Sequence, residues 1–115
     1  MDATAAVDAL GALAQEHRLA LFRLLVQAGD DGLPAGAIAQ ALGVPNSSLS
    51  FHLAQFRRAG LVQQERRHRS LIYRADYPAM KSLIGYLMEN CCQGASRASG
   101  AARVEARSRP ERKSA

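Results

Sequence analysis

Six arginines lie within eighteen residues of this sequence, its densest concentration of charge. They are Arg57, Arg58, Arg66, Arg67, Arg69 and Arg74, and Glu65 is the only acidic residue among them. Guanidinium groups bind phosphate through several N–H donors, so such a cluster is typical of a surface that contacts nucleic acid. In isolation, residues 66–69 could equally be the solvated tip of a hairpin.

Small polar side chains precede this cluster on a segment with helical periodicity. Leu49, Leu53 and Phe56 lie at i, i+4 and i+7, which predicts a helix with an inward apolar stripe. Hydroxyl-bearing side chains near its start would form a tip narrow enough for a major groove ~12 Å wide. The residues expected to contact DNA are Asn46, Ser47, Ser48, Ser50, His52, Gln55 and Arg58 on this helix, and Arg66, Arg67, His68 and Arg69 after it. In isolation, residues 46–48 could be only a helix cap, and His52 a packed histidine.

Cys91 and Cys92 are adjacent thiols near the end of the periodic part of the sequence. A disulfide between sequence neighbours is strained, so we expect both to be reduced. Paired thiolates select soft ions such as As(III), Sb(III) or Cu(I) over Mg²⁺ or Ca²⁺. Arsenite has three exchangeable hydroxyls, whereas a monomethylated arsenite has two, which two thiols would satisfy. Two alternatives are that Cys91 is a small buried hydrophobe and that the pair is a redox switch acting through an intersubunit disulfide.

The elements that must position these residues follow from the apolar pattern. We call the predicted helix that carries Leu49, Leu53 and Phe56 the recognition helix. Before it, the pattern predicts a first helix, marked by Val7, Leu10, Leu13 and Ala14, and a break at 15–18. A helix over 19–26 that is apolar around most of its circumference follows, then a turn at 29–32 and a short helix from Pro34 to Gly43. The recognition helix is capped by Asn46, Ser47 or Ser48 and ends at Gly60. Two extended runs at 61–62 and 71–73 flank a charged connection over residues 63–70. A last helix begins at Pro78, and its apolar stripe, Met80, Leu83, Ile84, Leu87 and Met88, is extended one turn by Cys91.

This order of elements predicts a winged helix-turn-helix. The expected fold class is mainly α with a small β-hairpin, in the order α-α-α-α-β-β-α. Residues 1–92 would form the DNA-binding and dimerisation domain, and residues 93–115 a disordered basic tail. The apolar stripes of the first and last helices exceed what one small core needs, so we expect a homodimer.

Composition limits the function classes. The net charge is +5, but residues 1–92 carry nine basic against eight acidic residues, and residues 93–115 carry six against two. Overall basicity is therefore weak evidence for nucleic acid. No apolar stretch approaches the ~20 residues of a membrane span, and Asp2 and Asp8 stand where a secretory signal is positive, so we expect a cytoplasmic protein. Because no nucleophile, phosphate-loop or paired-carboxylate motif is present, we expect no enzymatic activity.

The sequence resembles the ArsR/SmtB family of bacterial winged-helix repressors from about Leu10 to Cys92. The resemblance rests on the string HRLALF at residues 17–22, on Ser47, Ser50, His52 and Leu53, on AGLV at residues 59–62, and on Tyr73 and Arg74. Members are typically homodimers that repress an operon and release DNA when a metal, metalloid or other signal binds. The resemblance implies double-stranded operator DNA as the partner and no constitutive cofactor.

Two familiar sensor sites of that family are missing. Residues 33–38 hold no cysteine, and Asp76 on the last helix has no histidine after it. The segment from Glu89 to Cys92 is similar to the vicinal pair of arsenite-responsive members, which usually recruit a third cysteine that this chain lacks. The resemblance implies a repressor that releases its operator when arsenite, methylarsenite or antimonite binds Cys91 and Cys92. Alternatives are a response to redox or another thiol-reactive signal, and a winged-helix module that binds proteins.

Overall fold

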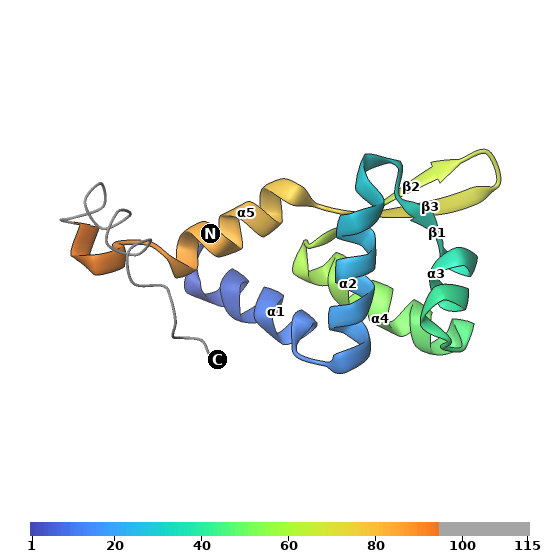
Figure 1. Cartoon of the computed structure of the whole chain (residues 1–115), viewed down its shortest axis with the longest axis horizontal. Helices are drawn as coiled ribbons and strands as arrows, with labels where there is room; N and C mark the ends of the chain where they lie inside the picture. Colours follow the sequence, from blue (N-terminus) through green and yellow to red (C-terminus); the bar gives the residue numbers. More distant parts are fainter. Residues whose placement is uncertain (95–115) are drawn as a thin grey trace, which may run out of the picture.

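The structure is a computed structural model that describes residues 1–94. From residue 95 on, the expected basic tail lies outside the described residues. The elements are α1 (Ala3–Leu13), α2 (Glu16–Ala28), η1 (Gly29–Asp31), β1 (Leu33–Pro34), α3 (Ala35–Leu42), α4 (Asn46–Ala59), β2 (Val62–Arg67), β3 (Ser70–Ala75), α5 (Tyr77–Leu87) and η2 (Cys91–Gly94), where η marks a short 3₁₀ helix. The expected fold class, a mainly helical winged helix-turn-helix with a small antiparallel sheet, is confirmed (Figure 1). No helix within residues 1–94 is long and apolar enough to span a bilayer.

The sheet has one strand more than the expected hairpin. Its order is β1-β3-β2, and β1 pairs with β3 through Leu33↔Tyr73 and Pro34↔Ile72. The expected charged connection over residues 63–70 is wrong, because β2 and β3 stay paired from Val62↔Ala75 to Arg67↔Ser70. Only His68 and Arg69 remain for the turn, and His68 adopts φ +56°. A two-residue hairpin turn with positive φ matches the right-handed twist of its strands, so it needs no glycine if another residue tolerates that φ.

The core lies between helices α1 to α5 and the sheet, with α1 contributing Ala6, Ala9 and Ala12 and α5 contributing Leu83. Its largest fully buried side chains are Leu21, Leu25, Ile38, Leu49, Phe56 and Leu61. Phe22 and Phe56 pack with their ring centroids 5.6 Å apart, which joins α2 to α4. The apolar residues around most of the second helix predict that it is the buried central helix. This prediction holds for one face only, because Leu21 and Leu25 are 0% exposed whereas Leu19 is 49% exposed. The buried face packs against α1, α3 and β3, and Phe22 reaches Phe56 of α4.

Helix starts differ from the expected ones by a few residues. The break at 15–18 shrinks to Ala14 and Gln15, because the Gln15 side chain caps α2 by accepting a hydrogen bond from the Arg18 N–H at 3.0 Å. The expected cap of the recognition helix by Asn46, Ser47 or Ser48 is wrong, because Pro45 holds the N-cap position and α4 begins at Asn46. The three polar side chains are therefore helical and project from its first turn. The predicted ends at Gly43 and Gly60 are confirmed by their left-handed φ values of +68° and +80°.

The last helix begins as expected and ends early. Pro78 lies in its first turn, and Asp76 caps it by accepting from the Ala79 N–H at 3.0 Å. The helix ends at Leu87, and Asn90 takes φ +59°, so the predicted extension of the apolar stripe to Cys91 is wrong. A residue at positive φ turns the chain out of the helical path. Cys91 and Cys92 belong to the separate turn η2.

Candidate nucleic-acid interface

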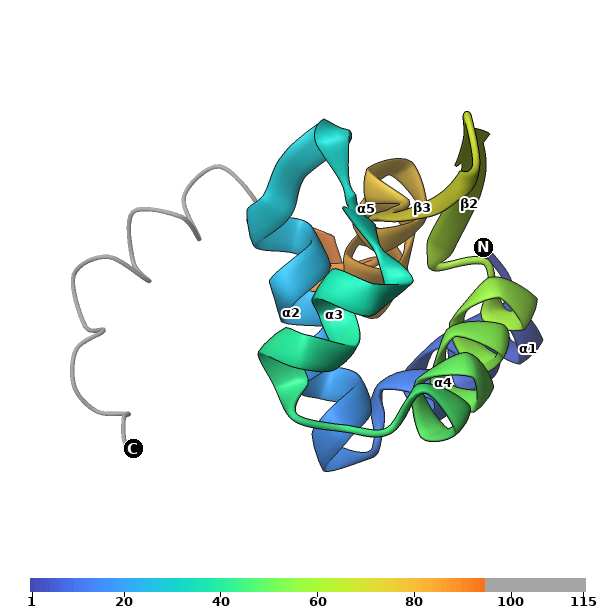
Figure 2. The ribbon, with the colours of Figure 1, turned by 90° about the vertical axis from the view of Figure 1, so that its right-hand side faces the viewer.

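The first turns of α4 present small polar side chains to solvent. Asn46, Ser47, Ser48 and Ser50 are all exposed, whereas Leu49 is 1% exposed and Leu53 3%. Helix α3 packs against α4 and α2, so the angle of α4 is fixed by the core (Figure 2). The sequence prediction of a narrow polar tip on a buried apolar stripe matches this placement.

Gln55 and Arg58 lie apart from that tip. The Arg58 guanidinium donates a hydrogen bond to the Gln55 carbonyl oxygen at 3.4 Å. Both residues line an open groove of about 390 Å³ between α1 and α4, whose other lining includes Asp8 and Arg18. Arg58 is eleven residues beyond Ser47, about 16 Å along the helix axis at 1.5 Å per residue. Such a residue fits a phosphate contact at the rim of a groove better than a base contact at its centre.

His52 faces the body of the protein rather than the outer side of α4. Its ring stacks on that of His17, with centroids 6.3 Å apart, and its buried Nδ1 meets no hydrogen-bond partner among the described residues. Burial, and then the charges of Arg18 and His17, lower its pKa below the usual 6.5. A neutral imidazole packed in this way supports the interpretation of His52 as a packed histidine over its interpretation as a residue that contacts DNA bases.

Sequence reasoning missed Phe51 as a candidate. Its side chain is 56% exposed on α4, and its ring lies under the guanidinium of Arg18, 5.8 Å from carbon Cζ to ring centroid. The signal was available, because Phe51 falls opposite the apolar stripe on a helical wheel. The periodicity placed Phe51 off the apolar stripe, but only the polar and basic side chains of that helix were taken as candidate DNA contacts.

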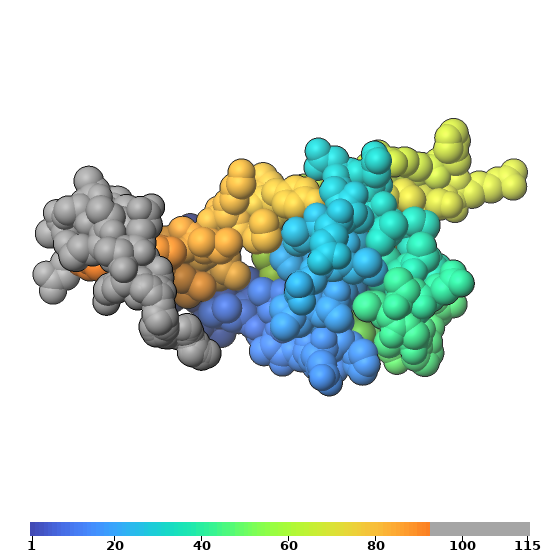
Figure 3. All heavy atoms as spheres, viewed as in Figure 1, coloured from blue at the N-terminus to red at the C-terminus, as the bar shows by residue number. Residues whose placement is uncertain are grey.

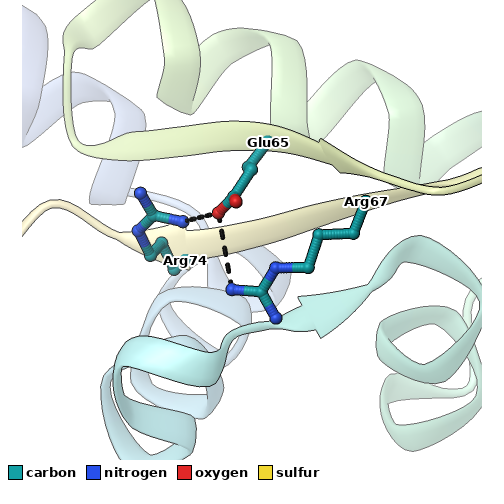
Figure 4. Close-up of polar contacts among 3 residues, drawn as sticks. All are labelled: Glu65, Arg67 and Arg74. Atoms are coloured by element: carbon teal, nitrogen blue, oxygen red, sulfur yellow. Dashed lines mark hydrogen bonds and ion pairs between the residues drawn. The ribbon is translucent and has the colours of Figure 1, made fainter.

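The basic hairpin divides into two sets of side chains. Glu65 on β2 accepts hydrogen bonds from Arg74 at 2.5 Å and from Arg67 at 3.4 Å (Figure 4). The hydrogen bonds from Arg74 and then Arg67 lower the pKa of Glu65 below its ordinary value of 4.5, so the carboxylate stays charged at neutral pH. Two of the clustered arginines are thus partly neutralised inside the protein.

Arg66, His68 and Arg69 form the second set, which we call the wing tip. All three side chains are exposed, and neither arginine makes an ion pair with any residue in the described part of the chain. In Figure 3 the hairpin projects beyond the body of the molecule. Within the hairpin, the arginines that are available to an external anion therefore lie at the end of this projection.

The turn η2, which holds the two cysteines, lies at the opposite end of the described structure from the β2–β3 hairpin (Figure 1). Both cysteines are exposed, and their sulfurs are 3.7 Å apart, well beyond a covalent S–S bond of about 2.05 Å. Two thiolates that hold one ion tetrahedrally at about 2.3 Å are separated by roughly 3.8 Å. The observed separation is close to that value.

Within residues 1–94, no cluster of three or more histidine, cysteine or carboxylate side chains could hold a metal ion. Asp76, the remnant of one family sensor site, is engaged otherwise: one carboxylate oxygen caps α5, and the other accepts from Gln63 at 3.1 Å. Among the described residues, a ligand bound by Cys91 and Cys92 would therefore meet two sulfurs and no third ligating side chain from the same chain.

Comparisons with known proteins agree on a class of regulators. A family model described as a helix-turn-helix domain matches residues 13–65. The transcriptional activator HlyU of Vibrio cholerae is 34% identical over 88 residues, covering 76% of this chain and 79% of HlyU. The nodulation protein NolR of Rhizobium meliloti is 31% identical over 88 residues, covering 76% of this chain and 70% of NolR.

Solved structures show the same fold. HlyU from Vibrio cholerae N16961 superposes with a TM-score of 0.62 at 33% identity, covering 81% of this chain and 100% of that one. The Mycobacterium bovis protein Mb0332, described as a homodimeric winged helix-turn-helix domain and a possible ArsR-family regulator, gives a TM-score of 0.62 at 24% identity, covering 79% of this chain and 84% of that one.

Proposed function

Because this chain belongs to the winged helix-turn-helix transcriptional regulators of the ArsR/HlyU type, we propose that it is a homodimeric repressor that releases its operator when a trivalent arsenical binds Cys91 and Cys92. The observation that carries the sensing half is the pair of exposed thiols 3.7 Å apart. The relatives named above support DNA binding, and the ligand and the direction of regulation are our inference.

The DNA-reading surface would be the start of α4 together with the wing tip. Asn46, Ser47, Ser48 and Ser50 are exposed donors and acceptors on a helix held by the core, which suits entry into a major groove. Arg66 and Arg69 would bind phosphates beside it, and His68 at the turn would lie next to the backbone. Arg67 would contribute less while it is paired to Glu65.

The dimer would form through α1 and α5, which pack on each other within the chain. They expose Val7, Leu10, Ile84, Leu87 and Met88, each 41–66% exposed. An exposed apolar surface of this kind on adjoining helices favours burial against a second copy. Mb0332, which has the same fold, is described as a homodimer. A two-fold pair would present two α4 helices to successive major grooves about 34 Å apart.

The thiol site would take an arsenical through two As–S bonds. Each thiol loses a proton as it displaces a hydroxyl, which leaves as water, so the arsenic stays trivalent. Methylarsenite is satisfied by two sulfurs, whereas arsenite keeps one hydroxyl unless a partner thiol completes the site. No constitutive cofactor is needed, and the arsenical acts as an inducing ligand.

Signal transfer would run through the last helix. The Cys91 N–H donates to the Met88 carbonyl at 2.9 Å, so η2 is hydrogen-bonded directly to the end of the exposed α5 stripe. Ligand at the thiols would shift that end and with it the spacing of the two α4 helices. A coupling of about 1–3 kcal/mol, typical of linked sites, would lower affinity for the operator 5–150-fold.

The test is a mobility-shift titration of the purified full-length chain on the DNA upstream of its own gene. Arsenite, methylarsenite and antimonite are added separately under reducing conditions. We expect release of DNA, with methylarsenite effective at the lowest concentration. Cys91→Ser with Cys92→Ser should bind DNA as well as wild type does and fail to release it.

Ser82→Ala, which alters an exposed polar residue of α5 outside the cysteine turn η2, serves as the control and should keep the response. Release by the double-serine variant would refute the thiol site. Release of wild type by peroxide, reversed by dithiothreitol, with no response to any arsenical would replace it with a redox switch. Failure to bind any DNA would refute the repressor itself.

A further inference from the structure

An exposed phenylalanine lies at the centre of the outward face of α4. At 100° per residue, the direction opposite the buried Leu49, Leu53 and Phe56 is occupied by Ser47, Phe51 and Arg58. Phe51 is 56% exposed although its neighbours on this face are polar. It lies four residues after Ser47, about 6 Å further along the helix, so both belong to its N-terminal half.

The ring of Phe51 is held by groups from two helices. The Arg18 guanidinium of α2 lies over it at 5.8 Å, a cation–π distance. The imidazole of His52 meets it edge-on, with centroids 6.1 Å apart and planes inclined by 61°. Isolated exposed apolar residues are common, but this ring also has a cation–π and an edge-on aromatic contact that hold its orientation. A ring whose rotamer is fixed loses little side-chain entropy on contact with a ligand.

The chemistry of the major groove offers one apolar target for such a ring. Among the four bases, only thymine presents a methyl group there, and phenylalanine is one of the side chains that contact it. The neighbouring serine hydroxyls can hydrogen-bond to several bases and discriminate weakly. We propose that Phe51 contacts a thymine methyl group and makes thymine the preferred base at one position of each half-site, with Arg18 and His52 positioning the ring.

This inference rests on the proposed entry of α4 into the major groove, and its test separates the two. Wild-type protein first selects duplexes from a random-sequence library, and the enriched half-site is determined. Each thymine of that site is then replaced singly by deoxyuridine, which keeps the Watson–Crick edge and the O4 acceptor but lacks the methyl group. Binding of wild type and Phe51→Ala to each duplex is measured.

At one thymine of each half-site, we expect deoxyuridine to weaken wild-type binding about fourfold, the factor for one methyl group left out of an apolar contact. Phe51→Ala should bind the thymine duplex about as weakly as wild type binds the deoxyuridine duplex, and should not distinguish the two. Phe51→Leu, which keeps an apolar contact, should retain part of the preference. Because the side chain is exposed, these variants should fold, which circular dichroism checks.

Leu19→Ala removes an exposed apolar side chain from α2 and should leave the fourfold preference unchanged. The inference is overturned if no thymine shows the preference in wild type, or if Phe51→Ala keeps it. Enrichment of a defined half-site in either of those cases would leave the regulator proposal standing. Selection of no sequence at all would refute both.

Discussion

The recognition helix α4 and the cysteine turn η2 are attached to the fold in opposite ways. Helix α4 places Leu49, Leu53 and Phe56 in the core, each at most 3% exposed. Among the described residues, Leu83 is the last in the buried cluster; η2 begins eight residues after it, and both cysteines of η2 are exposed. A helix that binds DNA must keep its conformation before and after binding, whereas a segment that senses a ligand must change its conformation when the ligand binds. The difference in packing matches those two demands.

The largest contrast should appear in stability. Phe56→Ala removes a fully buried ring that packs on Phe22, and should lower the free energy of unfolding by about 3–5 kcal/mol. Cys91→Ser with Cys92→Ser alters only exposed positions and should change it by less than about 0.5 kcal/mol. Urea unfolding followed by circular dichroism measures both. Equal destabilisation by the two variants would show that η2 is packed as firmly as α4, and would break the comparison.

A second contrast lies in DNA affinity. Arg66→Ala and Arg69→Ala each remove one unpaired cation from the wing tip, and each should weaken binding about tenfold and reduce the salt slope by about 0.9. Fluorescence anisotropy at several salt concentrations gives both quantities. Arg23→Ala removes an exposed arginine of α2 and should leave the slope unchanged. An unchanged slope in both wing variants would refute the assignment of the wing tip to phosphate.

The two regions also differ in what their sequence could predict. The position and outward face of α4 could be predicted because the periodicity of a helix lies in its own sequence. Leu49, Leu53 and Phe56 fix which side faces out, and Gly43 and Gly60 mark the flanking turns. Its details depended on tertiary contacts. Nothing local in Gln15 or Pro45 identifies them as the residues that cap α2 and α4.

Pairing with distant residues explains the other errors. Residues 63–67 are polar and were read as a loop, but they form a strand because β3 supplies the hydrogen bonds. Cys91 was placed on the α5 stripe because periodicity cannot show that Asn90 leaves the helical path. The sequence shows Glu65 among the arginines but not which of them it pairs with. The strand register places Arg74 opposite Gln63, close enough to pair with Glu65, and so separates paired from unpaired arginines.

Glu65→Gln tests the division of the hairpin arginines into those paired with Glu65 and those left unpaired. Loss of the carboxylate frees Arg67 and Arg74, so affinity for DNA at neutral pH should rise about two- to fivefold and the salt slope should increase. Gln63→Glu, which adds a carboxylate two residues earlier on the same strand face, should do the reverse. Anisotropy titrations measure both. Weaker binding by Glu65→Gln would mean that the carboxylate holds Arg67 and Arg74 in a productive geometry.

The same variant has a consequence for stability in acid. The folded-state pKa of Glu65 is depressed below 4.5, so its contribution is present above that value and is lost as pH falls through the lower folded pKa. Glu65→Gln should therefore lose less stability than wild type in that acidic window. Thermal unfolding across it measures the effect.

The smallest expected effect is the pH dependence of the packing behind α4. Burial lowers the pKa of His52 below 6.5, and the charges of Arg18 and His17 lower it further, so the unfolded chain takes up a proton more readily than the folded one. The stability linked to His52 is therefore complete above pH 6.5 and is lost as pH falls through the lower folded pKa. His52→Gln keeps a polar side chain without this titration, and should flatten the fall of Tm in that window, a change of a few degrees at most.

His68→Gln removes an exposed imidazole from the wing tip and should keep the wild-type fall of Tm. If His52→Gln keeps it as well, the acid sensitivity arises elsewhere. A flattened profile in His52→Gln but not in His68→Gln would place this acid-linked loss of stability in the packing that holds α4. Helix α4 would then respond to acid through the packing beneath it, whereas the proposed thiol site would respond to a ligand at the surface, because the two regions are attached to the fold in opposite ways.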